Sequence, residues 1–246
     1  MESVLVTFSG GVDSTFLAKV AADTLGKKAA AMTAVSASLP ADELAEARRL
    51  AGEIGIRHLL VDSRELDNPR YAANPVNRCY FCKSELFALA SRVAREQGLA
   101  VVADGTHADD LKEQRPGRQA AREWGVRSPL VEAGYTKEEI RQESRRLGLP
   151  TWDKPEMACL ASRLPTGTAV TVERLGQVER CETALKALGF RQLRARHHGR
   201  AVRLELEPTM ISRLLDERVR AGVVGACRSA GFERVLLDLA GYGRSS

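Results

Sequence analysis

The chain has 246 residues, of which 44% are hydrophobic and 28% charged, and its formal net charge is +5. This composition is ordinary for a soluble globular protein, and no apolar stretch is long enough to predict a membrane-spanning segment. The small excess of positive charge suits an anionic small-molecule substrate, and it is too weak to predict nucleic acid as a partner.

The first part of the chain alternates strand and helix signals. Strands are predicted at residues 3–8, 29–35, 57–61 and 100–104, with a weaker signal at 128–131, and helices at 14–26, 41–55, 83–97 and 136–148. This alternation predicts an α/β fold with a doubly wound parallel sheet, which binds ligands at the carboxyl ends of its strands. Residues 105–127 are irregular, and a loop of that length is usually functional or disordered.

The pattern changes after a segment, residues 151–168, that is punctuated by prolines and has no clear period. A helix is then predicted at 171–188, two strands of a hairpin at 191–197 and 201–206, a helix at 208–230 and a strand at 232–239. We therefore expect two domains, residues 1–165 and 166–246. The second is a small α+β domain, ferredoxin-like if one more strand precedes it.

A phosphate-binding loop is predicted between the first strand and the first helix. Two glycines there allow successive amides to point into one concavity, and the helix start adds free N–H groups and a positive dipole end. The residues of this loop are Ser9, Gly10, Gly11, Val12, Asp13 and Ser14. They resemble the SGGxDS loop of ATP pyrophosphatases, which cleave ATP between its α- and β-phosphates and adenylate a substrate oxygen. The alternative is a glycine-rich turn without a ligand.

Cysteine usage points to metal or catalytic chemistry. No basic segment followed by an apolar one precedes the first strand, so we expect no leader peptide and a cytoplasmic location, where disulfides are rare. Cys79 and Cys82 form a Cys-x-x-Cys pair before a helix, and Cys159 lies in a polar, proline-punctuated segment. Cys181 and Cys227 fall inside predicted helices and are interpreted as small core residues.

The trio Cys79, Cys82 and Cys159 leaves several interpretations open. Zinc would need a closed fourth position, which His58 or His107 could fill. A [4Fe-4S] cluster held by three cysteines keeps one iron open to an external ligand such as hydrosulfide. The trio could also comprise a thioredoxin-like redox pair, or thiols that bind nothing. The neighbouring ATP site favours the cluster, because an adenylated oxygen needs a nucleophile that a sulfur carrier would provide.

Further motifs strengthen a family resemblance that covers nearly the whole chain. They are residues 77–87 (NRCYFCKSELF), Asp104-Gly105-Thr106 with Asp109-Asp110, Arg115-Pro116-Gly117, and residues 159–167 (CLASRLPTG). Together with the phosphate loop they resemble the LarE sulfur transferases. The resemblance implies that ATP adenylates a carboxylate of pyridinium-3,5-biscarboxylic acid mononucleotide, and that sulfur displaces AMP to give a thiocarboxylate of the nickel-pincer nucleotide cofactor. Some members of the family sacrifice the sulfur of the cysteine that matches Cys159. Because this chain also has Cys79 and Cys82, it resembles the three-cysteine members that are proposed to hold a [4Fe-4S] cluster.

The resemblance also implies a role for each candidate residue. Those expected to bind ATP are Ser9, Gly10, Gly11, Asp13, Ser14, Ser36, Gly105 and Thr106. Asp13 and Asp110 are candidates for Mg²⁺, although the acidic loop pair Asp109-Asp110 could instead be only solvated. Those expected to bind the anionic pyridinium mononucleotide are Ser162, Arg163, Arg194 and Arg196. The last two share one face of a predicted strand, where guanidinium groups suit phosphate; a solvated strand face is the alternative.

The expected sulfur source is sulfide or another donor, and we expect a homo-oligomer in which the second domain binds substrate or joins subunits. Three different functions remain open. A tRNA thiolase would unite the same loop and cysteines, but would bring an RNA-binding extension or a strongly basic patch. An ammonia-using ligase would be indifferent to the cysteines. A nucleotide-binding module without catalysis would not need them.

Overall fold

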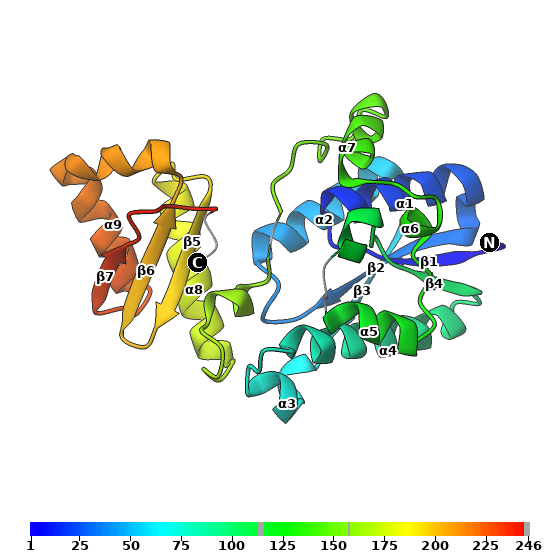
Figure 1. The fold of residues 1–246 in the computed structure, drawn as a ribbon, viewed down its shortest axis with the longest axis horizontal. Coiled ribbons are helices and arrows are strands. Elements are labelled where there is room, and N and C mark those ends of the chain that lie inside the picture. Colours follow the sequence, from blue (N-terminus) through cyan, green and yellow to red (C-terminus); the bar gives the residue numbers. More distant parts are fainter. Residues whose placement is uncertain (113–115, 157, 244–246) are drawn as a thin grey trace. The chain divides into compact units, whose positions relative to one another are not determined.

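The computed structural model describes residues 1–112, 116–156 and 158–243, and the chain divides into two compact units (Figure 1). The first unit consists of Met1–Tyr71 and Pro75–Met157, and the second of Ala72–Asn74 and Ala158–Ser246. The domain boundary expected from the sequence, after residue 165, stays a prediction.

A four-stranded parallel sheet forms the centre of the first unit, in the order β3-β2-β1-β4. Its strands are β1 (Val4–Thr7), β2 (Ala29–Val35), β3 (Arg57–Asp62) and β4 (Val101–Ala103), and the main connecting helices are α1 (Val12–Leu25), α2 (Ala41–Ile54) and α4 (Arg78–Glu96). The strand order reverses at β1, so the carboxyl ends of β1 and β4 border the topological switch point, where such folds bind ligands. This confirms the predicted α/β fold with a doubly wound sheet.

Helices cover both faces of this sheet (Figure 1). Val4 and Val6 of β1 pack with residues of α1, α2 and α7 (Lys137–Arg146), whereas Leu5 packs with residues of α4. Successive side chains of a strand point to opposite faces, so a short apolar strand contributes to both layers of core. The polar residues therefore lie at the ends of the strands and in the loops that follow them.

Short helices occupy regions where the sequence pattern is ambiguous. The weak strand signal at 128–131 is wrong, because α6 (Pro129–Glu132) begins there with a proline, which suits the first turn of a helix. The irregular stretch 105–127 contains η3 (Ala108–Lys112) and α5 (Pro116–Glu123). The remaining short elements of this unit are η1 (Gly26–Lys28), η2 (Glu65–Asp67) and α3 (Pro69–Ala72). No helix of the described chain is long and apolar enough to cross a membrane.

The second unit is built on a three-stranded sheet in the order β5-β6-β7. Its elements are η4 (Leu160–Arg163), α8 (Val172–Ala187), β5 (Leu193–His198), β6 (Ala201–Leu206), η5 (Pro208–Leu215), α9 (Glu217–Ser229) and β7 (Arg234–Leu237). β5 and β6 form the predicted antiparallel hairpin, and β7 pairs parallel to β6. The single helix predicted at 208–230 is divided at Asp216, whose carboxylate caps α9.

The two faces of β5 differ in burial. Leu193 and Ala195 are buried, whereas Arg194 and Arg196 alternate with them and lie on the opposite face. The prediction that both arginines share one face of a strand is therefore confirmed.

Candidate functional site

Residues 9–14 connect β1 to α1 at the carboxyl edge of the sheet. Gly10 has φ +71°, and a Cβ added there would lie 3.2 Å from the Cα of Ala47 in α2, so both backbone conformation and space require glycine. The hydroxyl groups of Ser9 and Ser14 lie 3.1 Å apart, and the Ser9 N–H donates to the Ser14 hydroxyl at 3.3 Å. Hydrogen bonds between Ser9 and Ser14 thus connect the two ends of the loop.

The start of α1 carries no side-chain cap, a property that it shares with α2, α4 and α6. Its N-cap residue, Gly11, makes no side-chain capping bond, whereas Thr136, Thr171 and Asp216 cap α7, α8 and α9 with their side chains. A helix start without a cap leaves N–H donors and the positive dipole end for an anion. Gly105 packs directly beside it, because an added Cβ would lie 3.0 Å from the Ser14 nitrogen.

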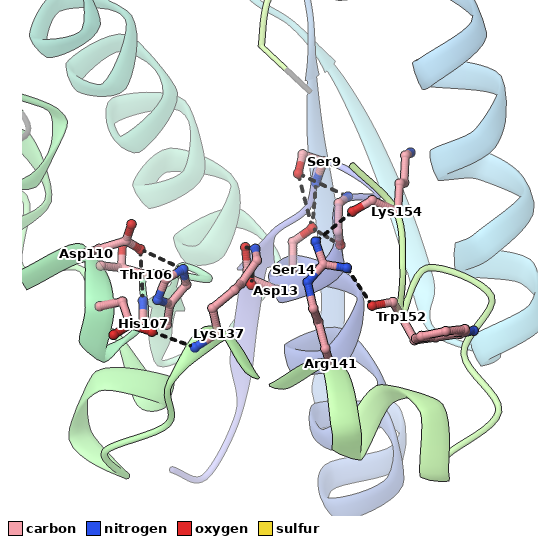
Figure 2. A network of polar contacts seen from close by, with 12 residues as sticks. Ser9, Asp13, Ser14, Thr106, His107, Asp110, Lys137, Arg141, Trp152 and Lys154 are labelled. Carbon is pink, nitrogen blue, oxygen red and sulfur yellow. Dashed lines mark hydrogen bonds and ion pairs between the residues drawn. The ribbon is translucent and has the colours of Figure 1, made fainter. Parts of the chain in front are cut away.

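Cationic side chains from distant parts of the chain gather beside this helix start (Figure 2). Lys137 Nζ lies 2.8 Å from both carboxylate oxygens of Asp13, although the residues are 124 positions apart. Lys154 Nζ donates to the Gly10 carbonyl at 3.2 Å and to Glu43 Oε2 at 2.8 Å. No motif predicted either lysine, since each lies more than a hundred residues from its partners.

Arg141 fixes the segment that carries Lys154. Its guanidinium donates to the Trp152 carbonyl at 2.7 Å and to the Lys154 carbonyl at 3.0 Å. Lys137 and Arg141 are four residues apart on α7, so one helix face supplies both contacts.

Ser36, a predicted nucleotide contact, follows directly after β2. Its hydroxyl donates to Glu65 Oε1 at 2.8 Å, and the Ser38 hydroxyl donates to the same oxygen. Glu65 is 4% exposed. A buried carboxylate needs such donors, and here they hold the turn after β2 in place.

Thr106, a second predicted nucleotide contact, follows β4. Its hydroxyl donates to Asp104 at 2.7 Å, and the Ser128 hydroxyl donates to the same carboxylate at 2.7 Å. Asp104 is buried. The two hydrogen bonds to Asp104 therefore fix the backbone on either side of Gly105.

Asp110, a candidate for Mg²⁺, is buried in η3. Its carboxylate accepts the His107 N–H at 3.1 Å and lies 3.4 Å from the ring nitrogen Nε2 of His107. Its neighbour Asp109 accepts the backbone N–H of Lys137 at 2.8 Å. Within the described residues of the first unit, no three His, Cys, Asp or Glu side chains form a group that could hold a metal ion.

Cys79 and Cys82 lie in the first two turns of α4, which begins five residues earlier than the helix predicted at 83–97. A spacing of three puts both thiol groups on one helix face. Gly117 packs against these turns, because an added Cβ would lie 2.9 Å from Lys83 Cγ. Arg115 of the same predicted motif lies outside the described residues. His58, one candidate for a fourth zinc ligand, instead contacts the Thr33 hydroxyl at 2.8 Å.

Cys159 belongs to the second unit, where it precedes η4. The Ser162 hydroxyl donates to the Cys159 carbonyl at 2.8 Å, and the Arg196 guanidinium donates to the Ser162 carbonyl at 2.8 Å. Arg194 stacks 4.8 Å above the ring of Tyr242. Hydrogen bonds thus connect Cys159 with Ser162 and Ser162 with Arg196, while the role of these residues in binding substrate stays a prediction.

Arg163 is buried, with 3% of its surface exposed. Its guanidinium pairs with both carboxylate oxygens of Glu182 at 2.9 and 3.2 Å. It also donates to the carbonyls of Ala158 and Cys159 at 2.7 and 3.2 Å. Its role as a substrate ligand stays a prediction, while these contacts fix the backbone on either side of Cys159.

Cys181 and Cys227 are both fully buried, and their sulfur atoms lie 3.2 Å apart between α8 and α9. The contact with Cys227 and burial raise the pKa of the Cys181 thiol. All five cysteines lie in the described part of the chain, and none of them forms a disulfide.

Comparisons with known proteins find relatives that match nearly the whole chain. A profile of the Asparagine synthase family matches residues 2–199. The chain is 48% identical to uncharacterized protein slr1717 of Synechocystis over 98% of this chain and 90% of that protein. It is 34% identical to pyridinium-3,5-bisthiocarboxylic acid mononucleotide synthase of Lactiplantibacillus plantarum over 98% of this chain and 87% of that protein. A weaker similarity, at 26% identity, links 62% of this chain with 52% of tRNA-specific 2-thiouridylase MnmA of Treponema denticola.

Proposed function

The chain belongs to the LarE family of the PP-loop superfamily, and we propose that it converts a carboxylate of pyridinium-3,5-biscarboxylic acid mononucleotide to a thiocarboxylate. It is an enzyme, an ATP-dependent sulfurtransferase of cofactor synthesis. The observation that carries the proposal is the loop of residues 9–14 at the start of α1, in which Gly10 has φ +71° and packs against Ala47 of α2. The relative named for the thiolated product supports the choice of substrate.

Adenylation is the first half of the proposed reaction. A carboxylate oxygen of the substrate attacks the α-phosphorus of ATP, the bond to the bridging oxygen breaks, and pyrophosphate leaves with that electron pair. Ser9, Gly11 and Ser14 would bind the β- and γ-phosphates, since their hydroxyl and amide groups line the loop. Asp13 is a half-buried carboxylate, a donor that suits Mg²⁺; the ion would neutralise phosphate charge.

The base of ATP would lie against the turns after β2 and β4. We assign Ser36, Gly105 and Thr106 to this side of the nucleotide. The hydroxyl groups of Ser36 and Thr106 are held by Glu65 and Asp104, respectively, so these two turns keep a fixed backbone. Fixed N–H and C=O groups can distinguish adenine from other bases by hydrogen bonding.

Sulfur transfer is the second half. A sulfur nucleophile attacks the acyl carbon of the adenylate, the bond from that carbon to the AMP oxygen breaks, and AMP leaves. Cys159 would take part directly, with its backbone held by Ser162 and Arg163. Arg194 and Arg196, on one face of β5, would bind the phosphate and carboxylate groups of the substrate.

Cys79, Cys82 and Cys159 have the donor chemistry that suits a [4Fe-4S] cluster. Cys79 and Cys82 share one helix face, and none of the three cysteines forms a disulfide. When bound, such a cluster would supply sulfur for transfer. Sacrifice of the Cys159 sulfur, which leaves dehydroalanine, is the competing source.

The test is exchange of labelled pyrophosphate into ATP, which reports the reverse of adenylation. We expect exchange that depends on pyridinium-3,5-biscarboxylic acid mononucleotide, and AMP with a thiocarboxylate product when sulfide is added under anaerobic conditions. Formation of ADP would contradict the proposal. Thiolation of tRNA, or an amide product with ammonium, would instead establish one of the competing functions.

A further inference from the structure

Lys154 contacts the phosphate loop although it lies 144 positions from Gly10 in the chain. We propose that Lys154 binds the pyrophosphate that leaves during adenylation, and that Glu43 positions it. The inference rests on the proposed function, because it assigns a further residue to the same ATP site.

The contacts of Lys154 leave it able to bind a phosphate. An ammonium group has three N–H donors. The contacts with the Gly10 carbonyl and Glu43 use two of these donors among the described residues. The third is available to a ligand in the loop, whose backbone lies 3.2 Å from the ammonium.

The chemistry of the leaving group calls for a full positive charge at this place. As the bond to the α-phosphorus breaks, pyrophosphate gains negative charge on the former bridging oxygen. The amide and hydroxyl groups of the loop are neutral donors, and the Gly10 carbonyl would repel a phosphate oxygen unless a cation neutralised it. The Lys154 side chain is only 17% exposed, and water therefore screens its charge weakly.

Two contacts hold the ammonium group of Lys154, with Gly10 and Glu43, and a third holds its backbone. The head group is held by Glu43 in the first turn of α2, at 2.8 Å. Glu43 lies four residues before Ala47, which packs on Gly10, so one face of α2 contacts both the loop and the lysine. The backbone carbonyl of Lys154 accepts from Arg141 at 3.0 Å. Lysine otherwise has a long, mobile stem, so these contacts preorganise the ammonium.

Lys137 is a second lysine near the loop, and its contact differs. It holds both oxygens of the Asp13 side chain at 2.8 Å and shows no contact with the backbone of the loop among the described residues. Lys154 is therefore the stronger candidate for a ligand that the loop backbone binds.

The test compares K154M and E43Q with a control, K19M. Lys19 is also a partly exposed lysine that pairs with a carboxylate, Asp23 at 2.6 Å, and it plays no part in the site. We expect K154M to slow pyrophosphate exchange into ATP by about 100-fold to 1000-fold and to raise the Kd for free pyrophosphate by about 10-fold to 100-fold. The Kd for AMP should stay unchanged, E43Q should raise the Kd for pyrophosphate by a smaller factor, and K19M should match the wild type.

Calorimetry with pyrophosphate alone separates this inference from the proposed function, because it needs no pyridinium substrate. Wild-type affinity for pyrophosphate in folded K154M would overturn the inference even if the enzyme transfers sulfur. Parallel loss of AMP and pyrophosphate affinity in E43Q would show that Glu43 is only structural. E43Q preserves the shape of the side chain, and it still tests the contact if K154M does not fold.

Discussion

Replacing Arg163 by methionine should destabilise the second unit, because it removes one partner of a buried ion pair. The guanidinium makes two contacts with Glu182, at 2.9 and 3.2 Å, and two with backbone carbonyls beside Cys159. In R163M the Glu182 carboxylate, with 6% of its side chain exposed, would retain the Ala195 N–H at 2.9 Å as its remaining donor among the described residues. Breaking such a pair costs about 3–5 kcal/mol.

Hydrogen exchange of the amides in α8 and β5, measured by mass spectrometry, reports the free energy of opening of this region. A loss of about 4 kcal/mol would speed exchange of the most protected amides by about 1000-fold. The double variant R163M/E182Q leaves no buried charge at these two positions and keeps an acceptor for the Ala195 N–H. It should therefore recover most of the loss, to within about 1–2 kcal/mol of the wild type.

The alternative role of Arg163, as a ligand of the substrate, makes the opposite prediction. Wild-type exchange rates in R163M, combined with a large rise in KM for the pyridinium mononucleotide, would refute the structural reasoning. An equal loss of stability in R163M and in R163M/E182Q would also refute it, because the uncompensated charge would then not be the cause.

Three further outcomes are expected. K137M removes the ammonium from Asp13, so Mn²⁺ should bind the ligand-free enzyme about fivefold more tightly in electron paramagnetic resonance titrations; unchanged affinity would contradict a metal role for Asp13. C181A and C227A should each lower stability by roughly 1–2 kcal/mol in urea unfolding and leave sulfur transfer intact, because both thiols are buried in the core; an inactive C181A would mean that the cysteines are misassigned. Cys159 should keep its mass over repeated turnovers with excess sulfide, and loss of H₂S from it in iron-free enzyme would establish the sacrificial route.

Much of the fold follows from local pattern. The strands of the first unit are short apolar runs whose neighbours are turn residues, and such runs predict buried parallel strands well. Two errors have local causes. The signal at 128–131 is apolar but begins with Pro129, which starts α6, and Asp216 ends one helical segment by capping the next. The early start of α4 escapes prediction because a Cys-x-x-Cys pair such as Cys79 and Cys82 is equally typical of a turn.

The phosphate loop of the candidate site could be predicted because it is continuous in sequence. Residues 9–14 form one motif, and their geometry can be inferred from two glycines and a helix start. Lys137 and Lys154 reach the loop from 124 and 144 positions away. Isolated lysines carry no local pattern, so only the folded chain reveals them. Arg163 shows the converse, because a motif cannot tell whether its charge faces a substrate or a buried glutamate.

The absence of a side-chain cap on α1 should also make the stability of the protein depend on its proposed nucleotide ligand. Thr136 caps α7 with its side chain, whereas Gly11 gives α1 no such bond, and under the proposed function the phosphates of ATP would accept from the free N–H groups of α1. A ligand present at a hundred times its Kd adds about 2.7 kcal/mol to the stability of the state that binds it. Unfolded and partly folded chains are the ones that proteases remove. Cells that exhaust their ATP should therefore lose this protein faster than cells that merely stop making it.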